Sequence, residues 1–285
     1  MAIGRDVYLD SRLQLQKLER LKVSSSSSPC LGAGVADQRA IERLLSSLMT
    51  DAGVFGWAAS LLPADLPLLQ DPVFAKDRED YSGIRRTAER DARTRPTALR
   101  EVALVFDLLE TTLLADDRDW ILKTPQPSLA DIEAVWPLHW LVSIPSALPT
   151  EKFSSAVYPK VYAWIQRFDE TVRAAKKKMG QKPLVLSGEE ASRMLVGSAY
   201  HEPSSEIEVD ETDFEVRSLG LKRGDRITVG PTDFGSSGRD EGVLVGMTAQ
   251  EVVYETRGED GVVRVHAPRH GFRIRKGRTG VELKL

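Results

Sequence analysis

Residues 125–140 constrain the fold of this chain more than any other stretch of its sequence. Ser128 and Asp131 stand three residues apart, directly ahead of an apolar run. In this arrangement the serine hydroxyl caps a helix start and the acid closes back on the cap residue, although Glu or Gln is commoner at that position. The pattern predicts an interior helix, kinked or broken at Pro137 because proline removes a mid-helix hydrogen bond. Its apolar positions are Ile132, Val135, Trp136, Trp140 and Leu141.

A second motif follows at residues 158–168, with the sequence Tyr-Pro-Lys-Val-Tyr-Ala-Trp-Ile-Gln-Arg-Phe. Together with Ser-Leu-Ala-Asp-Ile at residues 128–132, it resembles the C-terminal helical domain of glutathione S-transferases. The resemblance covers roughly residues 1–180. In that family the Ser-x-x-Asp box opens the central buried helix, and the second motif packs beside it. A capping box can open any buried helix, so Ser128 and Asp131 are structural residues with or without the resemblance.

The whole chain has the composition of a soluble globular protein. Its 285 residues are enough for two domains and a sizeable core. The formal net charge of −3 gives no strong electrostatic footprint for nucleic acid or for a membrane surface. The sequence lacks a membrane-spanning apolar run and a signal-peptide core, and its single cysteine, Cys30, agrees with a reducing compartment. We therefore expect a cytoplasmic protein with no nucleic-acid or membrane partner.

The first 22 residues predict a strand, a turn, a second strand and a helix capped by Asp10 and Ser11. The same order occurs late in the thioredoxin-like domain of glutathione transferases. The resemblance implies that Asp10 and Ser11 bind the γ-glutamyl end of glutathione, which is the expected co-substrate. A helix start suits a carboxylate because its N–H groups are unpaired. An ordinary helix cap is the alternative interpretation of this pair.

This N-terminal segment also departs from the family pattern. The family's first strand, first helix, second strand and cis-proline loop would precede it, and the Tyr, Ser or Cys that activates the glutathione thiol has no counterpart in the sequence. Because the thiolate is the nucleophile, conjugation without such a donor is weak. We therefore expect a truncated remnant and impaired transfer of glutathione to a hydrophobic electrophile. A non-catalytic scaffold, dimerisation or ligand-carrying module is the alternative, and a homodimer is implied by the resemblance alone.

Composition and turn residues divide the chain into five segments. Residues 1–22 are the thioredoxin-like remnant, residues 23–36 a Ser-rich linker and residues 37–200 the helical bundle. A second, acidic linker over residues 201–213 leads to residues 214–285, whose short alternating runs predict a small antiparallel β-barrel or twisted sheet. This module resembles one appended to fungal-type glutathione transferase-like proteins. The expected fold class is thus mainly α, with a partial thioredoxin-like remnant and a small β-rich domain.

Apolar periodicity predicts further long helices, at residues 37–60, 84–116 and 151–179. Residues 61–82 predict an irregular connection, and Ser187 and Glu190 a second capping box. In a transferase, the first two of these helices would form the wall of a hydrophobic acceptor pocket. Three aromatic residues on them either line that pocket or belong to the plain core: Phe55, Trp57 and Phe106.

Two features of residues 214–285 bear on binding. His266 and His270 are four residues apart, but they flank Pro268 and no acid or cysteine cluster completes a site, so we expect no metal. The end of the chain is also locally basic, which could favour an anionic partner. A solvated strand face balanced by nearby acids is the alternative. The basic residues are Arg264, Arg269, Arg273, Arg275, Lys276 and Arg278.

Overall fold

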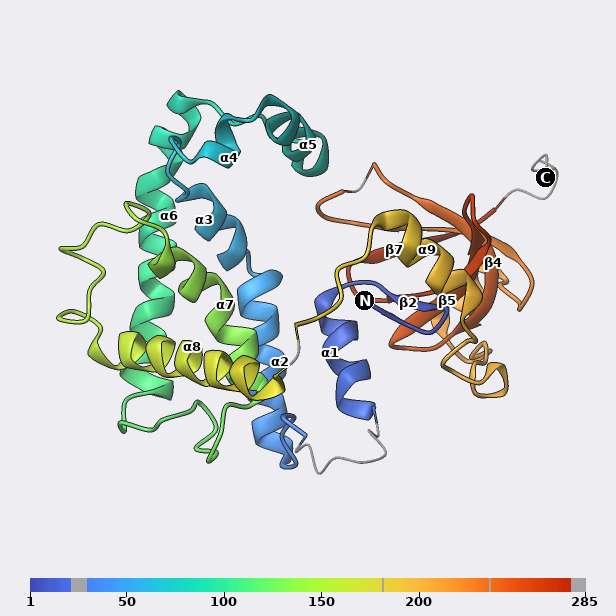
Figure 1. Cartoon of the computed structure of the whole chain (residues 1–285), viewed down its shortest axis with the longest axis horizontal. Coiled ribbons are helices and arrows are strands. Elements are labelled where there is room, and N and C mark those ends of the chain that lie inside the picture. The colour runs from blue at the N-terminus through green and yellow to red at the C-terminus, as the bar shows by residue number, and fades with distance from the viewer. Residues whose placement is uncertain (22–29, 181, 236, 278–285) are drawn as a thin grey trace. The chain divides into compact units, whose positions relative to one another are not determined.

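The computed structural model describes residues 1–21, 30–180, 182–235 and 237–277, which fall into two compact units. The sheet unit consists of Met1–Leu21, Arg78–Ile84 and Pro183–Leu285, and the helical unit of Lys22–Asp77 and Arg85–Lys182. Figure 1 shows the strands in the first unit and the bundle of long helices in the second. The N-terminal segment thus belongs to the same unit as the C-terminal strands, whereas the sequence predicted separate domains.

The helical unit is organised around α7 (Leu129–Ser143), which contacts α2, α3 and α8 (Figure 1). Its apolar residues join one core with those of its neighbours, which confirms the predicted interior helix. The other elements of this part of the chain are α2 (Ala36–Thr50), α3 (Val54–Ser60), α4 (Pro67–Gln70), α5 (Pro72–Ser82), α6 (Ala88–Leu108), the π-helical turn η1 (Leu109–Leu113) and α8 (Pro159–Met179).

The predicted capping box is formed, and its acid is a hub of the helical unit. Asp131 is fully buried, and its Oδ2 accepts hydrogen bonds from the backbone N–H and the hydroxyl of Ser128, at 2.9 and 2.8 Å. Its Oδ1 accepts from the Ile121 N–H and from Nε1 of Trp164, both at 2.9 Å. Trp164 belongs to the second family motif, so a single carboxylate joins the two motifs that suggested the fold.

Three predictions for the helical unit differ from the structure, and each concerns proline or glycine. α7 is not broken at Pro137, because packing of its buried face outweighs one missing hydrogen bond; α6 likewise contains Pro96. Residues 61–82 contain α4 and α5 instead of an irregular connection, since their prolines stand at helix starts, where no N–H is needed. The expected helix over residues 37–60 is divided at Gly53, whose φ is +84°.

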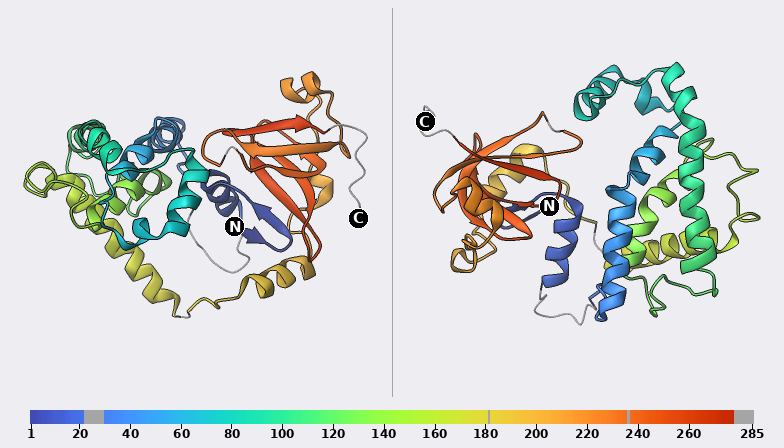
Figure 2. Two further views of the ribbon diagram at one scale, coloured as in Figure 1. Left: turned by 90° about the horizontal axis from the view of Figure 1, so that it is seen from above. Right: turned by 180° about the vertical axis from the view of Figure 1, so that it is seen from behind.

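The sheet unit contains one mixed sheet with the strand order β1-β2-β6-β5-β4-β3-β7. β2 runs parallel to β6, with Val7 opposite Val265, and the other neighbouring strands are antiparallel. Figure 2 shows the N-terminal strands in blue beside the red and orange C-terminal strands. The strands are β1 (Ala2–Ile3), β2 (Asp6–Tyr8), β3 (Arg226–Pro231), β4 (Asp240–Met247), β5 (Glu251–Arg257), β6 (Val262–Pro268) and β7 (Phe272–Lys276).

The predicted C-terminal barrel is not confirmed. In the part of the sheet that the structure describes, β1 and β7 are the two edges, and they are not paired with each other. The end of the predicted β-rich segment, residues 278–285, lies outside the described residues, as do residues 23–29 of the first predicted linker. The structure confirms a strand-rich C-terminal segment. Its sheet also includes the N-terminal strands, which the sequence did not predict.

The helices of the sheet unit are α1 (Ser11–Arg20), α9 (Gly188–Gly197), the 3-10 turn η2 (Ser204–Glu206) and α10 (Phe214–Leu219). The predicted capping box at Ser187 and Glu190 opens α9. The predicted β-rich segment begins at residue 214, but residues 214–216 instead begin α10, because the Asp213 carboxylate accepts the N–H groups of residues 215 and 216. Among the described residues, no helix combines the length and the apolarity that crossing a bilayer requires.

Candidate functional site

The predicted glutathione contacts, Asp10 and Ser11, stand at the start of α1. Asp10 caps the helix, and its Oδ1 accepts the Arg12 N–H at 2.8 Å and lies 3.5 Å from Arg12 Nε. Asp10 has a φ of +60°, which turns the chain from β2 into the helix. Ser11 is exposed. The structure therefore places both residues at a helix start, with Asp10 engaged in the cap and Ser11 open to solvent.

A cluster of charged side chains lies between β2, β5, β6, α1 and the segment that precedes η2. We call it the buried charge network, and it consists of Asp6, Lys17, Glu202, Glu251, Arg264 and His266. The side chains of Asp6, Arg264 and His266 are fully buried. Asp6 and Arg264 face each other because β2 and β6 pair with these two residues in register.

Asp6 is the centre of the buried charge network. Its Oδ2 accepts hydrogen bonds from Nη2 of Arg264 at 2.9 Å and from the backbone N–H groups of His201 and Glu202, at 2.7 and 2.9 Å. Its Oδ1 binds Nε of Arg264 and lies 3.2 Å from Nε2 of His266. Burial by itself would raise the pKa of Asp6, but the hydrogen bonds to His266 and Arg264 outweigh burial and hold it well below its usual range.

His266 bridges two carboxylates. Its Nε2 faces Asp6, and its Nδ1 lies 3.1 Å from Oε2 of Glu251. Burial would lower the pKa of His266, but the hydrogen bonds to Asp6 and Glu251 raise it above its ordinary value. A protonated imidazolium can donate to both carboxylates at once, whereas a neutral ring can donate to only one.

Lys17 and Tyr8 complete the network on the side of α1. Nζ of Lys17 lies 2.6 Å from Glu202 Oε1 and 2.8 Å from Glu251 Oε1, and the Tyr8 hydroxyl donates to the same Glu202 oxygen at 2.9 Å. Burial, followed by the neighbouring Glu202 carboxylate, raises the pKa of Tyr8 far above its usual value. Tyr8 therefore remains a neutral phenol that already donates its proton.

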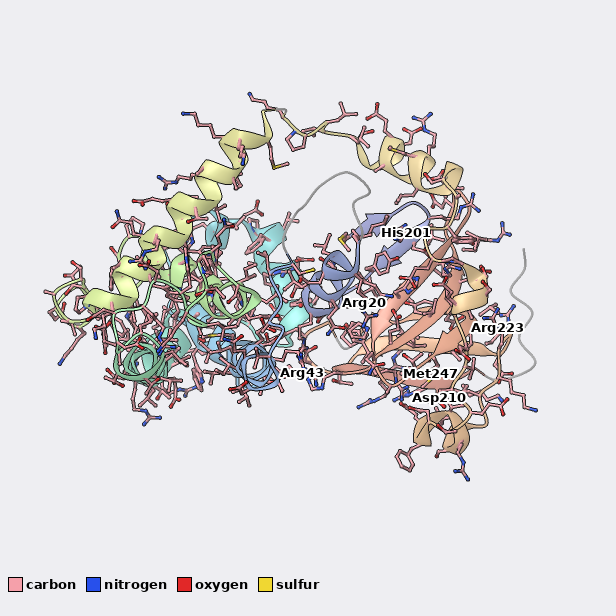
Figure 3. All side chains as sticks on the ribbon, turned by 90° about the horizontal axis from the view of Figure 1, so that it is seen from below. Arg20, Arg43, His201, Asp210, Arg223 and Met247 are labelled. Atoms are coloured by element: carbon pink, nitrogen blue, oxygen red, sulfur yellow. The ribbon has the colours of Figure 1, made fainter. Side chains whose placement is uncertain are left out.

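A cavity of about 280 Å³ opens beside this end of the network. It has a mixed lining, made of Ile3, Tyr8, Lys17, Arg20, Leu21, His201, Glu202, Pro203 and Glu206. Figure 3 marks Arg20 on α1 and His201 on the segment that precedes η2. Asp10 and Ser11 are not part of this lining. The structure thus separates the predicted helix-start contacts from the cavity, whose lining instead includes Lys17 and Glu202.

Three residues of the network have the geometry of metal ligands. One ligand atom each from Glu202, Glu251 and His266 lie within 4.8 Å of one another. The Lys17 ammonium, however, is hydrogen-bonded to both carboxylates. A metal ion would have to displace this ammonium, so the donor set is occupied by the protein's own cation. His270, which the sequence analysis paired with His266, is not in the group.

The basic C-terminal stretch divides into two groups. Arg264 pairs with Asp6, Arg269 with Asp213 and Glu215, and Lys276 with Asp225. These pairs agree with the interpretation of a strand face balanced by acids. Arg273 and Arg275 are exposed on β7, the strand that also contains Lys276, and Arg278 lies outside the described residues.

The aromatic residues of the predicted acceptor pocket lie in two places. Phe106 is fully buried and packs on Phe153 and Tyr158, with ring centroids 5.2 and 5.1 Å apart. Phe55 packs on the rings of Trp136 and Trp140 instead, and Trp57 packs against the core. Phe106 is therefore a core residue, which was the alternative interpretation.

The buried charge network was not predicted from the sequence, although the sequence contains a signal for it. Asp6 and Tyr8 stand two apart in one strand, and Arg264 and His266 two apart in another, so each pair shares a face. Charged residues at the inward positions of otherwise apolar strands indicate a buried pair, because an unpaired charge is too costly to bury. Periodicity alone could not tell which two strands were neighbours.

Comparisons with known proteins concern mainly the fold. A family model described as a domain of unknown function (DUF7962) matches residues 57–177. No curated protein matches the chain. Among solved structures, the crystal structure of a GST-like protein from Pseudomonas syringae is similar with a TM-score of 0.59 and 22% sequence identity, over 97% of this chain and 80% of that chain. The chain therefore has a glutathione transferase-like fold.

Proposed function

We propose that this protein is a glutathione transferase-like protein that binds glutathione at the start of α1 and conjugates it only weakly. The observation that carries the proposal is an exposed serine that follows a capping aspartate at a helix start, within a chain of glutathione transferase-like fold. The positive end of the helix dipole favours a carboxylate at this position.

Each residue of the pair has a distinct role in this proposal. The Ser11 hydroxyl and the N–H groups at the start of α1 bind the carboxylate of the γ-glutamyl end. Asp10 faces the amine of the same group with its negative charge, while its Oδ1 continues to cap the helix. The remainder of the glutathione molecule and a hydrophobic electrophile would extend beyond these residues.

Weak conjugation is expected because Tyr8, which stands two residues before Asp10 in the sequence, is not available to a thiol. A thiolate is stabilised by a hydroxyl that donates to sulfur. The Tyr8 hydroxyl already donates to Glu202, and its raised pKa shows that the phenol holds its proton tightly. The Glu202 carboxylate would in addition repel a thiolate placed near it.

Titration with glutathione, followed by isothermal calorimetry and by retention on immobilised glutathione, tests the binding step. We expect weak, saturable binding that Ser11→Ala removes. Ser187→Ala is the matched control, because Ser187 is also exposed at a helix start of the sheet unit. Binding that survives Ser11→Ala, or no binding by the folded protein, would contradict the proposed contact. Rapid conjugation of chlorodinitrobenzene would show instead that the thiol is activated.

A non-catalytic scaffold or ligand-carrying module is the second candidate. This candidate is favoured by the contacts of α1, because its polar side chains form hydrogen bonds with other parts of the sheet unit. Nε2 of Gln14 donates to the Tyr8 carbonyl at 2.9 Å, and Lys17 holds Glu202 and Glu251 together. If the folded protein binds no glutathione, this structural role of α1 becomes the better account.

A further inference from the structure

The outward face of β3 and β7 carries two arginines side by side. The strands are antiparallel, with Thr228 opposite Arg275 and Gly230 opposite Arg273. Ile274, between the two arginines, is only 3% exposed and belongs to the core of the sheet unit. Because successive side chains of a strand point to opposite faces, Arg273 and Arg275 both lie on the outer face.

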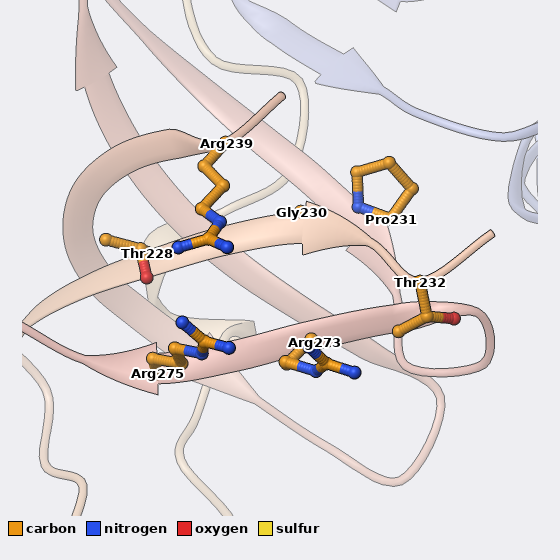
Figure 4. A pocket seen from close by; sticks show the side chains of 7 residues that line it. All are labelled: Thr228, Gly230, Pro231, Thr232, Arg239, Arg273 and Arg275. Atoms are coloured by element: carbon orange, nitrogen blue, oxygen red, sulfur yellow. The ribbon is translucent and has the colours of Figure 1, made fainter. Parts of the chain in front are cut away.

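A glycine allows a third arginine to reach this face. A Cβ atom on Gly230 would lie 2.7 Å from the Gly238 carbonyl oxygen and 3.2 Å from Cγ of Arg239. The chain at residues 238 and 239 therefore crosses directly over β3 at Gly230, at a distance that a side chain would prevent. Figure 4 shows Arg239 reaching over β3, on the face where Arg273 and Arg275 lie.

The guanidinium groups of the three arginines have no counter-charge in the part of the chain that the structure describes, in contrast to two other cations of the sheet unit. Arg269 is paired with Asp213 and Glu215, and Lys276 with Asp225. The guanidinium groups of Arg239, Arg273 and Arg275 make no hydrogen bond or ion pair with any of the described residues. Like charges held together without an acid repel one another, so an anion bound among them would stabilise the arrangement.

These arginines line a cavity of about 340 Å³, which lies within the usual size range of small-ligand sites. We call it the arginine cavity; its lining is Thr228, Gly230, Pro231, Thr232, Arg239, Arg273 and Arg275 (Figure 4). The two threonine hydroxyls add neutral donors beside the guanidinium groups. The planar fork of a guanidinium matches two oxygens of a phosphate group, and charge-assisted bonds of this kind are about twice as strong as neutral ones.

We propose that the arginine cavity binds a phosphate-bearing ligand, whose phosphate oxygens accept hydrogen bonds from Arg239, Arg273 and Arg275. Three positive charges suit a doubly charged phosphate monoester or a pyrophosphate better than a single carboxylate. The phosphate could belong to a free phosphorylated molecule or to a lipid headgroup, and the recognition chemistry is the same for both. The residues that line the cavity include no aromatic ring on which a base could stack, so a single-stranded nucleic acid fits less well.

Calorimetric titration with inorganic pyrophosphate at physiological ionic strength tests the proposal in solution. We expect saturable binding that Arg273→Gln, Arg275→Gln and Arg239→Gln each weaken about tenfold, as expected for loss of a charge-assisted contact. Arg257→Gln is the matched control, because Arg257 is an exposed arginine of the same sheet that does not line the cavity. Circular dichroism confirms that each variant is folded.

The variant Gly230→Ala tests whether binding depends on the shape of the arginine cavity as well as on its charge. It keeps all three arginines, but its methyl group must push residues 238 and 239 away from β3, so we expect it to weaken pyrophosphate binding as much as Arg239→Gln does. Equal affinity in Arg239→Gln, Arg273→Gln and the natural protein would overturn the proposal, because binding would then not depend on these guanidinium groups.

Flotation with phosphatidylcholine vesicles, with and without phosphatidic acid, distinguishes the two sources of phosphate. Flotation that requires phosphatidic acid and is lost in Arg273→Gln supports a lipid headgroup. Pyrophosphate binding without flotation supports a free phosphorylated ligand. Failure to bind both pyrophosphate and phosphatidic acid, with the protein folded, overturns the proposal. These results do not depend on glutathione, so they leave the proposed function of α1 to its own test.

Discussion

Asp131 in the helical unit and Asp6 in the sheet unit are both fully buried carboxylates, yet the protein satisfies them in different ways. Asp131 accepts hydrogen bonds from neutral donors: two backbone N–H groups, a serine hydroxyl and an indole N–H. Asp6 is bound by the guanidinium of Arg264 and by His266, together with two backbone N–H groups. Hydrogen bonds from neutral donors replace the water that a buried carboxylate loses, and they bring no further charge into the core. Charged donors such as Arg264 and His266 are themselves costly to bury unless they stay paired with an acid.

The two sites also differ in how far apart their partners stand in the sequence. Ser128 and Asp131 are three residues apart, and Asp131 and Trp164 are 33 apart. Asp6 and Arg264 are separated by 258 residues. Removing either acid should therefore disturb a different set of elements, and the two units of the chain allow the effects to be measured separately.

The largest effect is expected for Asp6→Ala. The substitution leaves Arg264 and His266 buried without their shared counter-charge, which should lower the free energy of unfolding of the sheet unit by about 4 kcal/mol. Hydrogen exchange measured on peptides from β2 and β6 would report the loss. The five tryptophans, Trp57, Trp120, Trp136, Trp140 and Trp164, lie in the helical unit, so their fluorescence transition is the internal control. A change below about 1 kcal/mol would mean that the ion pair adds little to the fold.

A smaller but still large loss is expected for Asp131→Ala, which leaves the buried donors of Ile121 and Trp164 without an acceptor. We expect a loss of about 3 kcal/mol in the helical unit, measured by urea unfolding followed by tryptophan fluorescence. Ser128→Ala removes only one of the hydrogen bonds and should cost about 1 kcal/mol. Equal, small losses for the two variants would show that the acid acts only as a local cap.

Raising the pH should lower the stability of the sheet unit through His266, which has no counterpart at Asp131 in the helical unit. The folded sheet unit raises the pKa of His266, so protonated His266 contributes stability that is fully present below its unfolded pKa of about 6.5. That contribution is lost as the pH rises through the higher pKa of the folded state. Hydrogen exchange corrected for its intrinsic pH dependence should show β6 losing protection between neutral and alkaline pH. In His266→Gln this pH-dependent loss should disappear; if it persists unchanged, another group causes it.

The smallest effect concerns the exposed capping box of α9. Ser187 and Glu190 make the same reciprocal hydrogen bonds as Ser128 and Asp131, with distances of 2.8 Å from the N–H and the hydroxyl of Ser187 to Glu190 Oε2. Water can replace these bonds when the serine is removed. Ser187→Ala should therefore cost about 0.5 kcal/mol, seen as faster exchange of the first amides of α9. A loss as large as that of Ser128→Ala would show that burial does not set the value of a capping box.

For the candidate site, the sequence predicted the helix start at Asp10 and Ser11, and α1 is found there; their role toward glutathione stays a prediction. The basic stretch was visible in the sequence, but the sequence did not show which of its residues are paired with acids and which are not. Arg264 forms an ion pair with Asp6, from the opposite end of the chain. Arg273 and Arg275 instead line a cavity with Arg239, which can approach because Gly230 has no side chain. Neither relation follows from spacing, because both depend on which strands are neighbours.

The sequence by itself determined the features that are complete within one or two turns of chain. Both capping boxes and the strand-rich character of residues 214–285 follow from local hydrogen bonds and from alternation of side chains. Only the tertiary structure decided that β2 pairs in parallel with β6, and this pairing creates the buried charge network. The physical reason is that the donors and acceptors of a capping box are all within a few residues of one another. The edge of a strand, in contrast, offers the same backbone N–H and C=O groups to any other strand, so the strand that pairs with it is decided by the packing of the whole unit.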